Sequence, residues 1–585
     1  MMVYTGAEMV IECLRKEGVD TIFGYPGGVV IPVFDTLFHA NDINVILTRH
    51  EQAAVHAADA YARSSGKTGV CLVTSGPGAT NTVTGLATAN FDSVPLVCIS
   101  GQVPRNMIGN DAFQEADVVG ITRPVTKHNY IVTEREKLSK TLKESFHIAS
   151  TGRPGPVVID VPKDVFTQPI EDSYPSKVSL IGYSTPGKGH KGQVKRAAAA
   201  INEAQKPLLF AGGGINVGDS SDIFRKIVKK TKIPVVTSLM GIGAIDTNNE
   251  NNLGMLGMHG TYAANMAVSS CDLIFGIGVR FDDRVTGDLA KFAPHAKIVH
   301  LDIDPSAIAR NVPVEIPIVG DAGLVLEELL PLLDTPERSE WHSIIADWKK
   351  AAKCKNATEG KDLPEIPTAR LMPLEVINKV NRKFPEAIVT TEVGQNQMWT
   401  ALYWEFKKSR TFITSGGLGT MGYGFPAAVG AAIANPDKRV IAVSGDGSFQ
   451  MNLQELATAV KNKLSIVIVI LNNGYLGMVR QWQEMFYGKR YSSTHLNDVE
   501  TLEKQPEVTP DGTPDFIKLA DAYGAAGYRV YNSNDLSEAI EKASANTSGP
   551  TIIDCIIEPE ANVFPMVPPG AGLEEMVFCT NEDEE

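Results

Sequence analysis

Short apolar runs that end in glycine recur along the chain. Residues 70–73, 207–211 and 440–443 are three of them, and each runs into a glycine-rich turn. Because these runs do not alternate with polar residues, they predict strands buried on both faces, as in parallel sheets covered by helices. The pattern therefore predicts an α/β fold built from several doubly wound parallel-sheet units.

Two polar stretches interrupt this rhythm. Residues 167–193 are rich in Pro, Gly, Ser and Lys, and residues 334–373 are polar with a short helical pattern around residues 341–352. Such segments are typical of linkers. They predict domains at residues 1–170, 190–333 and 372–560, followed by an acidic tail at residues 561–585. The first and third domains share the same strand-and-glycine rhythm, and residues 496–513 predict a long surface loop.

Composition narrows the function classes. With 43% hydrophobic and 21% charged residues among 585, the chain is an ordinary globular protein rather than a disordered or coiled-coil one. A net charge of −14 repels phosphate backbones and anionic lipids, so neither nucleic acids nor membranes are expected partners. Seven scattered cysteines and the lack of a signal-peptide pattern favour the cytoplasm. Small molecules are the expected ligands.

A glycine-rich turn with an aspartate follows the apolar run at residues 440–443. Asp446 lies between two glycines, and Asn473 follows the next apolar run, residues 466–471. Glycines at a strand-to-helix turn let backbone N–H groups approach a phosphate, and parallel sheets bind ligands at the ends of their strands. Mg²⁺ prefers a few protein oxygens together with phosphate oxygens and water. We therefore expect Asp446, Asn473 and the backbone carbonyl of Tyr475 to hold Mg²⁺; the alternative is an ordinary surface turn.

The spacing of Asp446 and Asn473 resembles the diphosphate- and magnesium-binding signature of enzymes that use thiamine diphosphate. A second motif of that superfamily, a glutamate that follows a strand in the pyrimidine-binding domain, matches Glu51. A carboxylate there pairs with N1′ of the aminopyrimidine ring and favours the imino tautomer that takes the C2 proton. The resemblance thus implies proton transfer by Glu51; capping of the helix that begins near it is the alternative.

Further strings extend the resemblance over nearly the whole chain and narrow it to the catalytic subunits of the acetohydroxyacid synthase family. These strings are residues 24–28, 111–115, 152–157, 162–164, 254–260, 280–287, 477–482 and 565–570. The resemblance implies three domains that bind, in chain order, the pyrimidine ring, FAD and the Mg²⁺–pyrophosphate group. It also implies decarboxylation of pyruvate and condensation of the two-carbon remainder with a second pyruvate or with 2-ketobutyrate. The products are 2-acetolactate and 2-aceto-2-hydroxybutyrate, which enter branched-chain amino acid biosynthesis.

The resemblance assigns the thiamine diphosphate contacts to glycine turns and their neighbours in the first and third domains. The expected residues are Tyr25, Pro26, Gly27, Glu51, Pro77, Asn81, Val393, Gly394, Gln395, Gly419, Met421, Gly447, Ser448, Leu476, Gly477 and Met478. Gly28 and Gln114 are expected to make polar contacts in the transition state.

A flavin site is expected in the central domain. The resemblance implies FAD contacts at Gly212, Gly213, Gly214, Leu239, Met240, Gly257, Met258, His259, Arg280, Asp282, Asp302 and Asp321, with no redox role for the flavin in the main reaction. The glycine triplet is weak evidence by itself, since a tight turn between strand and helix needs glycine with or without a nucleotide. An acidic residue at a strand end, such as Asp302, suits a ribose or adenine group.

Arg284, Gln114, Phe113 and Lys163 are matched to the substrate channel, and Trp482 is matched to the border of the second-substrate pocket. Arg284 suits a ketoacid carboxylate through two parallel N–H bonds, with an ion pair to a neighbouring aspartate as the alternative. Trp482 is implied to favour a ketoacid with one more methylene, although its helical spacing with Met478 also fits plain core packing. Phe113 and Lys163 complete the set, and Lys163 is equally compatible with a solvated charge.

The resemblance implies a homodimer or homotetramer, because Glu51 and Asp446 belong to different domains and meet across a subunit boundary in the family. It also implies a small regulatory subunit. Two departures from the family pattern are Asn106, where a basic residue is usual, and the long segment at residues 496–513. A flavin-using oxidase, a simple decarboxylase and a nucleotide-binding regulatory protein remain the competing interpretations.

Overall fold

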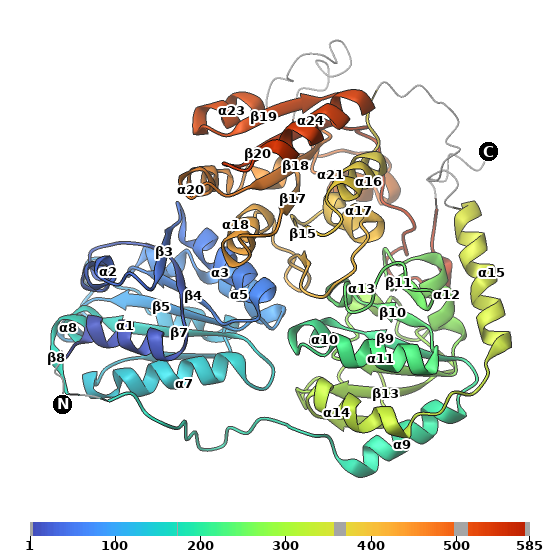
Figure 1. Ribbon diagram of the computed structural model, residues 1–585, viewed down its shortest axis with the longest axis horizontal. Coiled ribbons are helices and arrows are strands. Elements are labelled where there is room, and N and C mark those ends of the chain that lie inside the picture. The colour runs from blue at the N-terminus through green and yellow to red at the C-terminus, as the bar shows by residue number, and fades with distance from the viewer. Residues whose placement is uncertain (1–3, 172, 356–369, 497–512, 579–585) are drawn as a thin grey trace.

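The computed structural model describes residues 4–171, 173–355, 370–496 and 513–578. Within these ranges the chain forms three six-stranded sheets whose strands are all parallel. Figure 1 shows the first domain on the left, the central domain at lower right and the third domain above both. The predicted α/β fold with three parallel-sheet units is confirmed.

The first sheet has the order β3-β2-β4-β5-β7-β6. Its strands are β2 (Thr21–Tyr25), β3 (Asn44–Leu47), β4 (Gly69–Val73), β5 (Leu96–Gln102), β6 (His128–Ile131) and β7 (Pro156–Pro162). The helices are α1 (Gly6–Lys16), α2 (Ile31–Phe38), α3 (Glu51–Ser65), α4 (Pro77–Thr80), α5 (Val83–Phe91), α6 (Val118–Thr122), α7 (Leu138–Ser150) and α8 (Lys163–Thr167). Strands β4, β5 and β7 are buried throughout, as predicted for a sheet covered on both faces.

The third sheet, β16-β15-β17-β18-β20-β19, repeats the strand order of the first. Its strands are β15 (Ile388–Thr391), β16 (Phe412–Ile413), β17 (Val440–Gly445), β18 (Ile466–Asn472), β19 (Ala526–Val530) and β20 (Thr551–Ile556). The helices are α16 (Pro373–Lys383), α17 (Gln395–Tyr403), α18 (Gly424–Ala434), α19 (Asp446–Phe449), α20 (Leu456–Lys461), α21 (Gly477–Phe486), α23 (Phe516–Tyr523) and α24 (Ser533–Ala545). The predicted likeness of the two domains is thus a shared topology.

The central sheet is different, with the order β11-β10-β9-β12-β13-β14. Its strands are β9 (Pro207–Ala211), β10 (Val235–Thr237), β11 (Asn252–Met255), β12 (Leu273–Ile277), β13 (Lys297–Asp302) and β14 (Ile316–Val319). The helices are α9 (Lys191–Glu203), α10 (Gly213–Val217), α11 (Ser221–Thr231), α12 (Tyr262–Ser270), α13 (Asp283–Thr286) and α14 (Ala322–Leu329). Numbered along the chain, this order is 3-2-1-4-5-6, in which ligands bind where the order reverses, between β9 and β12.

The first and third domains are joined by α3 and α18, which pack against each other at the centre of the molecule (Figure 1). A buried charge cluster reinforces this joint. Arg63 pairs with Asp59 at 2.7 Å and with Asp92 at 3.0 Å, and the Tyr423 hydroxyl of the third domain donates to Asp59. Because these groups are buried, they satisfy one another rather than water.

The predicted linkers and tail contain more structure than their composition indicates. Strand β8 (Pro169–Ile170) pairs with β1 (Tyr4–Thr5), and the helical pattern near residue 341 is a longer helix, α15 (Ser339–Lys355), anchored by buried Trp341. The tail returns to the central domain, where the Val567 N–H donates to Met258 O at 2.8 Å. Its buried apolar side chains explain this docking. Residues 497–512 of the predicted loop lie outside the described residues.

Between α19 and β18, the chain forms a 3₁₀ turn, η7 (Leu453–Glu455), which leads directly into α20. Among the described residues, no helix has both the length and the apolar character needed to cross a membrane.

Candidate active site

The structure brings Asp446, Asn473 and Tyr475 together at the ends of two paired strands. Gly445 of β17 lies opposite Leu471 of β18, so the residues that follow each strand are neighbours. The Gly474 N–H donates to Asp446 Oδ2 at 3.0 Å, and the Tyr475 N–H donates to Asn473 Oδ1 at 3.1 Å. The oxygen-bearing groups predicted for Mg²⁺ therefore share one turn region.

Burial disfavours the charged form of the Asp446 carboxyl, which a bound cation would stabilise. The carboxyl is buried, and burial raises its pKa to about 7 against the opposing effect of backbone hydrogen bonds. A bound divalent cation would reverse this by favouring the ionised form. No cluster of three or more His, Cys, Asp and Glu side chains that could hold a metal occurs in the described part of the chain. The donor set instead suits a hard cation whose shell is completed by phosphate oxygens and water.

Glycines at this turn are required by close packing. A Cβ on Gly477 would lie 2.1 Å from Gln395 Oε1, and one on Gly447 would lie 2.9 Å from Leu476 Cδ2. Gln395 in turn accepts from the Asn473 side chain at 3.3 Å. The predicted cofactor residues of β15, β17 and β18 therefore form one compact group, to which buried Ser448 also belongs.

Glu392 is a buried residue of this region that the sequence did not reveal. Its carboxylate accepts from the N–H groups of Gly422 at 2.7 Å and Phe425 at 3.1 Å, and burial raises its pKa to about 7. It ties the predicted Val393–Gly394 turn to the turn that carries Met421. An acidic residue directly after the apolar strand β15 was the available signal.

Glu51 is the first residue of α3 in the first domain. The Asn81 amide donates to Glu51 Oε2 at 2.9 Å, and a Cβ on Gly78 would lie 3.5 Å from Oε1. Nearby, the buried hydroxyls of Thr74 and Ser75 have no hydrogen-bond partner in the structure. Buried polar groups without partners are expected where a ligand binds, so this region fits a polar heteroaromatic ring.

Other residues of the first domain predicted to contact thiamine diphosphate lie at the end of β2, which neighbours β3 in the sheet, and at the start of α4. Tyr25 ends β2 and is followed by Pro26, Gly27 and Gly28, whereas Pro77 begins α4. A Cβ on Gly27 would lie 2.6 Å from the Thr74 side chain, which explains the glycine.

A large cavity, of about 1050 Å³, is lined mainly by the central and third domains and also by residues of the first. Of the residues predicted to bind FAD, all but Gly212 and Gly257 line it: Gly213, Gly214, Leu239, Met240, Met258, His259, Arg280, Asp282, Asp302 and Asp321. It opens where the order of the central sheet reverses, and its volume is at the upper end of the usual range for ligand pockets. Burial raises the pKa of Asp302 to about 6.

Gly212 and Gly257, which do not line the cavity, are glycines because the backbone around them is closely packed. A Cβ on Gly212 would lie 2.0 Å from Gly278 O, and one on Gly257 would lie 2.3 Å from Arg284 O. Close packing therefore explains a glycine in the triplet whether or not a nucleotide binds there, which is the alternative stated for this motif. The fit of a dinucleotide rests on the size, position and polar lining of the cavity.

Arg284 and Trp482 meet at one end of this cavity. The guanidinium carbon of Arg284 lies 5.9 Å from the centre of the Trp482 ring, a cation–π arrangement. Arg284 Nε also lies 3.8 Å from Asp283 in an exposed pair, and its Nη1 donates to Met258 Sδ at 3.6 Å. Both interpretations of Arg284 thus have a structural counterpart. Met478, Val393, Gly394 and Gly419 line the same cavity.

The residues of the first domain predicted to contact substrate lie elsewhere. None of Gly28, Glu51, Phe113, Gln114 and Lys163 lines the large cavity of the single chain, nor does Asp446. Phe113 is 88% exposed, and Lys163 is an exposed residue at the start of α8. Gln114 has a φ of 61°, an uncommon conformation for a residue with a side chain.

Several cavity-lining residues were missed by the sequence analysis, including Asp92, Arg153 and residues 185–187 of the predicted linker. Asp92 accepts from the N–H groups of Gly416 at 3.0 Å and Gly417 at 2.7 Å. It follows a helix rather than a strand, so a search of strand ends does not find it.

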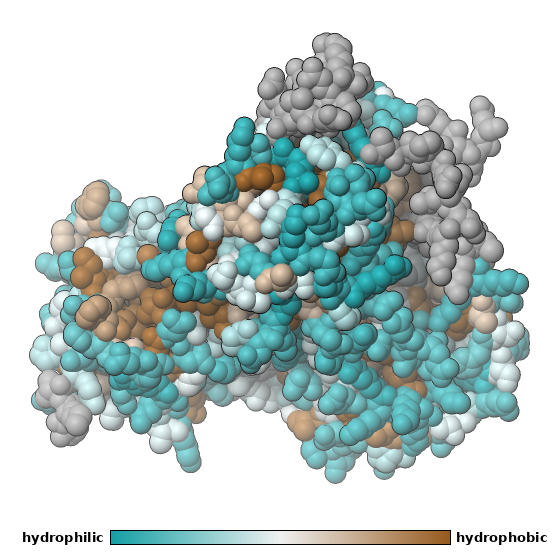
Figure 2. Space-filling model, turned by 45° about the horizontal axis from the view of Figure 1, so that its top comes forward, coloured by the Kyte–Doolittle hydropathy of each residue, from teal (hydrophilic) through white to brown (hydrophobic). Residues whose placement is uncertain are grey.

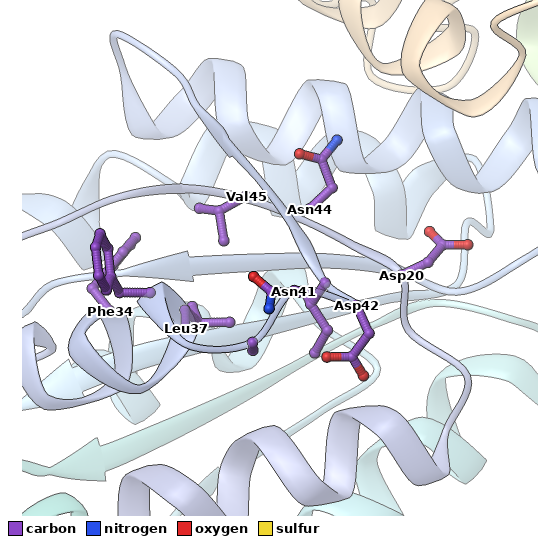
Figure 3. A pocket seen from close by; sticks show the side chains of 10 residues that line it. Asp20, Phe34, Leu37, Asn41, Asp42, Asn44 and Val45 are labelled. Carbon is purple, nitrogen blue, oxygen red and sulfur yellow. The ribbon is translucent and has the colours of Figure 1, made fainter.

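A second, smaller pocket of about 490 Å³ lies in the first domain (Figure 3). Asn44 and Val45, at the beginning of β3, line it together with Leu37 and Phe34. Glu51 follows the other end of that strand. Because ligands of parallel sheets bind at the carboxyl ends of the strands, this pocket is not part of the candidate active site.

Comparison with known proteins identifies all three domains. The description "Thiamine pyrophosphate enzyme" applies to each match: the N-terminal TPP binding domain over residues 4–121, the central domain over residues 194–329 and the C-terminal TPP binding domain over residues 392–555. The last range contains Asp446 and Asn473, and the first contains Glu51.

Curated relatives match along the entire chain. The acetolactate synthase large subunit of Haemophilus influenzae is 46% identical, with 99% of each chain covered. The isozyme 3 large subunit of Escherichia coli acetolactate synthase is 45% identical over 100% of both chains. A probable acetolactate synthase large subunit of Methanocaldococcus jannaschii is 47% identical over 98% of this chain and 95% of its own. The chain therefore belongs to the acetolactate synthase large-subunit family of thiamine pyrophosphate enzymes.

Proposed function

We propose that this chain catalyses the condensation of pyruvate with a second pyruvate or with 2-ketobutyrate. The observation that carries the proposal is the oxygen-donor group of Asp446, Asn473 and Tyr475 at two adjacent strand ends, within a chain that matches acetolactate synthase large subunits over its full length. Thiamine diphosphate, when bound, supplies the electron sink on which a 2-ketoacid can lose CO₂.

Glu51 holds a proton at N1′ of the aminopyrimidine ring. The Asn81 amide occupies Oε2, which leaves Oε1 to share that proton. A positioned carboxyl group of this kind contributes about 10²–10⁴-fold to a proton transfer.

Asp446, Asn473 and the carbonyl of Tyr475 would hold Mg²⁺, and the bound cation would fix the diphosphate. The support is the type and number of the donors and the burial of the Asp446 carboxyl, which disfavours its charge until a cation is present. Gln395 and Gly477 pack against this group and keep its geometry.

Arg284 and Trp482 select the second ketoacid. The Arg284 guanidinium orients the carboxylate, and the Trp482 ring forms an apolar wall beside it. An added methylene in such a pocket contributes about 1–3 kcal/mol, enough for a preference for 2-ketobutyrate. Gly28, Phe113, Gln114 and Lys163 would complete the channel from the first domain of a second copy.

FAD would occupy the large cavity. Its support is the position of that cavity at the reversal of strand order and the strand-end carboxyl of Asp302. We assign the flavin a structural role, as the family resemblance implies.

The active unit is a homodimer or a larger assembly of dimers. Figure 2 shows apolar side chains gathered over the first domain, and its exposed large apolar residues include Ile31, Phe38 and Phe113. Such patches favour an interface with another chain. The name "large subunit" of the relatives supports a small regulatory partner, and the cytoplasmic location remains a prediction.

Product analysis tests the proposal. The chain, supplied with pyruvate, thiamine diphosphate, Mg²⁺ and FAD, should form 2-acetolactate as its main product. Acetate or acetaldehyde as the main product would instead identify an oxidase or a decarboxylase. With equal concentrations of both acceptors, 2-aceto-2-hydroxybutyrate should exceed 2-acetolactate.

A further inference from the structure

The turn that carries Glu51 is held by the third domain of the same chain. The Arg49 N–H donates to Glu455 Oε1 at 2.8 Å, and the His50 N–H also bonds to this carboxylate. The Thr458 hydroxyl donates to Glu455 Oε2 at 2.6 Å and lies 3.3 Å from Leu47 O. Glu455 of η7 and Thr458 of α20 thus contact the last residue of β3 and two of the three residues that connect it to Glu51.

Both side chains are buried at the joint between the domains. Glu455 is 1% exposed and Thr458 is fully buried. A buried carboxylate is costly unless each oxygen has a partner, and here the partners are two backbone N–H groups and a hydroxyl. Moving the turn would leave that carboxylate unsatisfied, so Glu455 restricts the turn to one position.

This contact bears directly on the direction of the Glu51 side chain. The two N–H groups belong to the residues immediately before Glu51, and the His50 ring accepts from the Gln52 N–H at 3.1 Å. Together these bonds fix the backbone on both sides of Glu51, and hence the direction in which its carboxyl points.

Other contacts between the two domains lie farther along α3 and on α5. Tyr423 Oη donates to Asp59 on α3, and Thr88 of α5 hydrogen-bonds to Thr420 at 2.7 Å. These contacts hold the domains together without touching the start of α3. Loss of Glu455 would therefore loosen the Glu51 turn while the joint itself remains.

We infer that Glu455 is a positioning residue, which acts on the proposed proton transfer by aligning the Glu51 carboxyl with N1′ of the aminopyrimidine ring. The inference rests on the proposed function, because it needs Glu51 in that role. A catalytic group displaced by about 1 Å can lose about 10²-fold in rate, so an alignment contact at the backbone has a measurable effect.

The test measures exchange of the C2 hydrogen of bound thiamine diphosphate for deuterium, in full-length protein with Mg²⁺ and without ketoacid. Acid quench and proton NMR give the rate, fluorescence titration gives the cofactor Kd, and thermal unfolding gives Tm. Glu455→Ala should slow exchange between tenfold and about a hundredfold, with a small change in Kd. Glu455→Gln, which keeps an oxygen for the Arg49 N–H, should restore most of the rate.

Tyr423→Phe is the matched control, because it removes a buried hydrogen bond between the same two domains at the middle of α3, two turns beyond Glu51. It should lower Tm and leave the exchange rate unchanged. An exchange rate in Glu455→Ala no slower than in Tyr423→Phe overturns the inference, since Glu455 would then serve only to join the domains.

Two further variants keep the outcomes distinct. If Glu455→Ala does not fold, Thr458→Val decides, because Glu455→Gln is expected to be close to the parent: a several-fold slowing in Thr458→Val supports alignment, and a parental rate in that variant overturns it. Glu51→Gln runs in parallel. A parental exchange rate in that variant refutes the proton role of Glu51 itself, which is a failure of the proposed function and leaves Glu455 nothing to align.

Discussion

The first and third domains have the same strand order but differ in the residues that follow corresponding strands. The third strand of the first domain, β4, is followed by the neutral hydroxyls of Thr74 and Ser75. Its counterpart β17 is followed by Asp446, a buried carboxyl. At the second strand the carboxyl is in the first domain instead: β3 is followed by the turn to Glu51, whereas its counterpart β16 is followed by the neutral Thr414.

This difference shows that the scaffold determines where a ligand lies, and the residue at each strand end determines what kind of ligand it is. Neutral donors around one carboxyl suit a polar heteroaromatic ring. Carboxyl and amide oxygens that converge on one point suit a cation and its diphosphate. Two domains with the same strand order would thus bind the two halves of one coenzyme, its pyrimidine ring and its diphosphate.

The largest expected effect comes from the carboxyl of the first domain. Glu51→Gln should lower kcat by about 10²–10⁴-fold while thiamine diphosphate stays bound, because the amide cannot take or return a proton. Steady-state kinetics and a cofactor titration check both statements.

Glu375→Gln is its control. Glu375 also lies in the first turn of a helix, α16, outside the candidate site. If both variants lose a little stability and neither loses activity, Glu51 is only a helix cap, and the contrast between the two domains fails.

The next effect concerns the metal. Asp446→Asn should weaken Mg²⁺-dependent binding of thiamine diphosphate by at least about 10²-fold, since losing even a hydrogen-bond partner of a metal ligand costs about 10–100-fold. Without cofactor the variant should unfold at the same temperature as the parent or higher, because an unpaired buried carboxyl is removed. Calorimetric titration and thermal unfolding separate the two effects, and unchanged cofactor affinity would place the metal elsewhere.

A smaller effect is expected where the third domain meets the substrate. Trp482→Leu should reduce the ratio of 2-aceto-2-hydroxybutyrate to 2-acetolactate by about tenfold, with little change in the rate with pyruvate alone. Phe486→Leu is the matched control, because Phe486 lies on the same helix and does not line the cavity. An equal change in both variants would indicate repacking of α21 rather than contact with substrate.

Sequence patterns predicted the sheets and the strand-end residues because both depend on local order. Buried runs such as β17 and β18 and the turns that follow them are readable within a few residues, and the structure brings Asp446 and Asn473 together as expected. Glu392, Asp92 and Glu455 were missed, because their partners lie in other elements or other domains. Only the tertiary fold brings such groups together.

The smallest expected effect is a pH-dependent change in stability at Asp160, one of two buried aspartates that lie in corresponding strands. Asp554 of β20 pairs with Arg529 at 2.9 Å, whereas Asp160 of β7 has only the neutral donors Ser100 and Gln102, and burial raises its pKa to about 7. A raised pKa in the folded state means that the contribution of Asp160 to stability is full below about pH 4 and is lost as pH rises through 7. Asp160→Asn stays neutral, so the Tm of the parent relative to this variant should fall by about 2–4 °C between pH 5 and pH 7.5. Tm curves that run parallel across this range would show that the Asp160 carboxyl is ionised throughout, so that its neutral donors outweigh the effect of burial on its pKa.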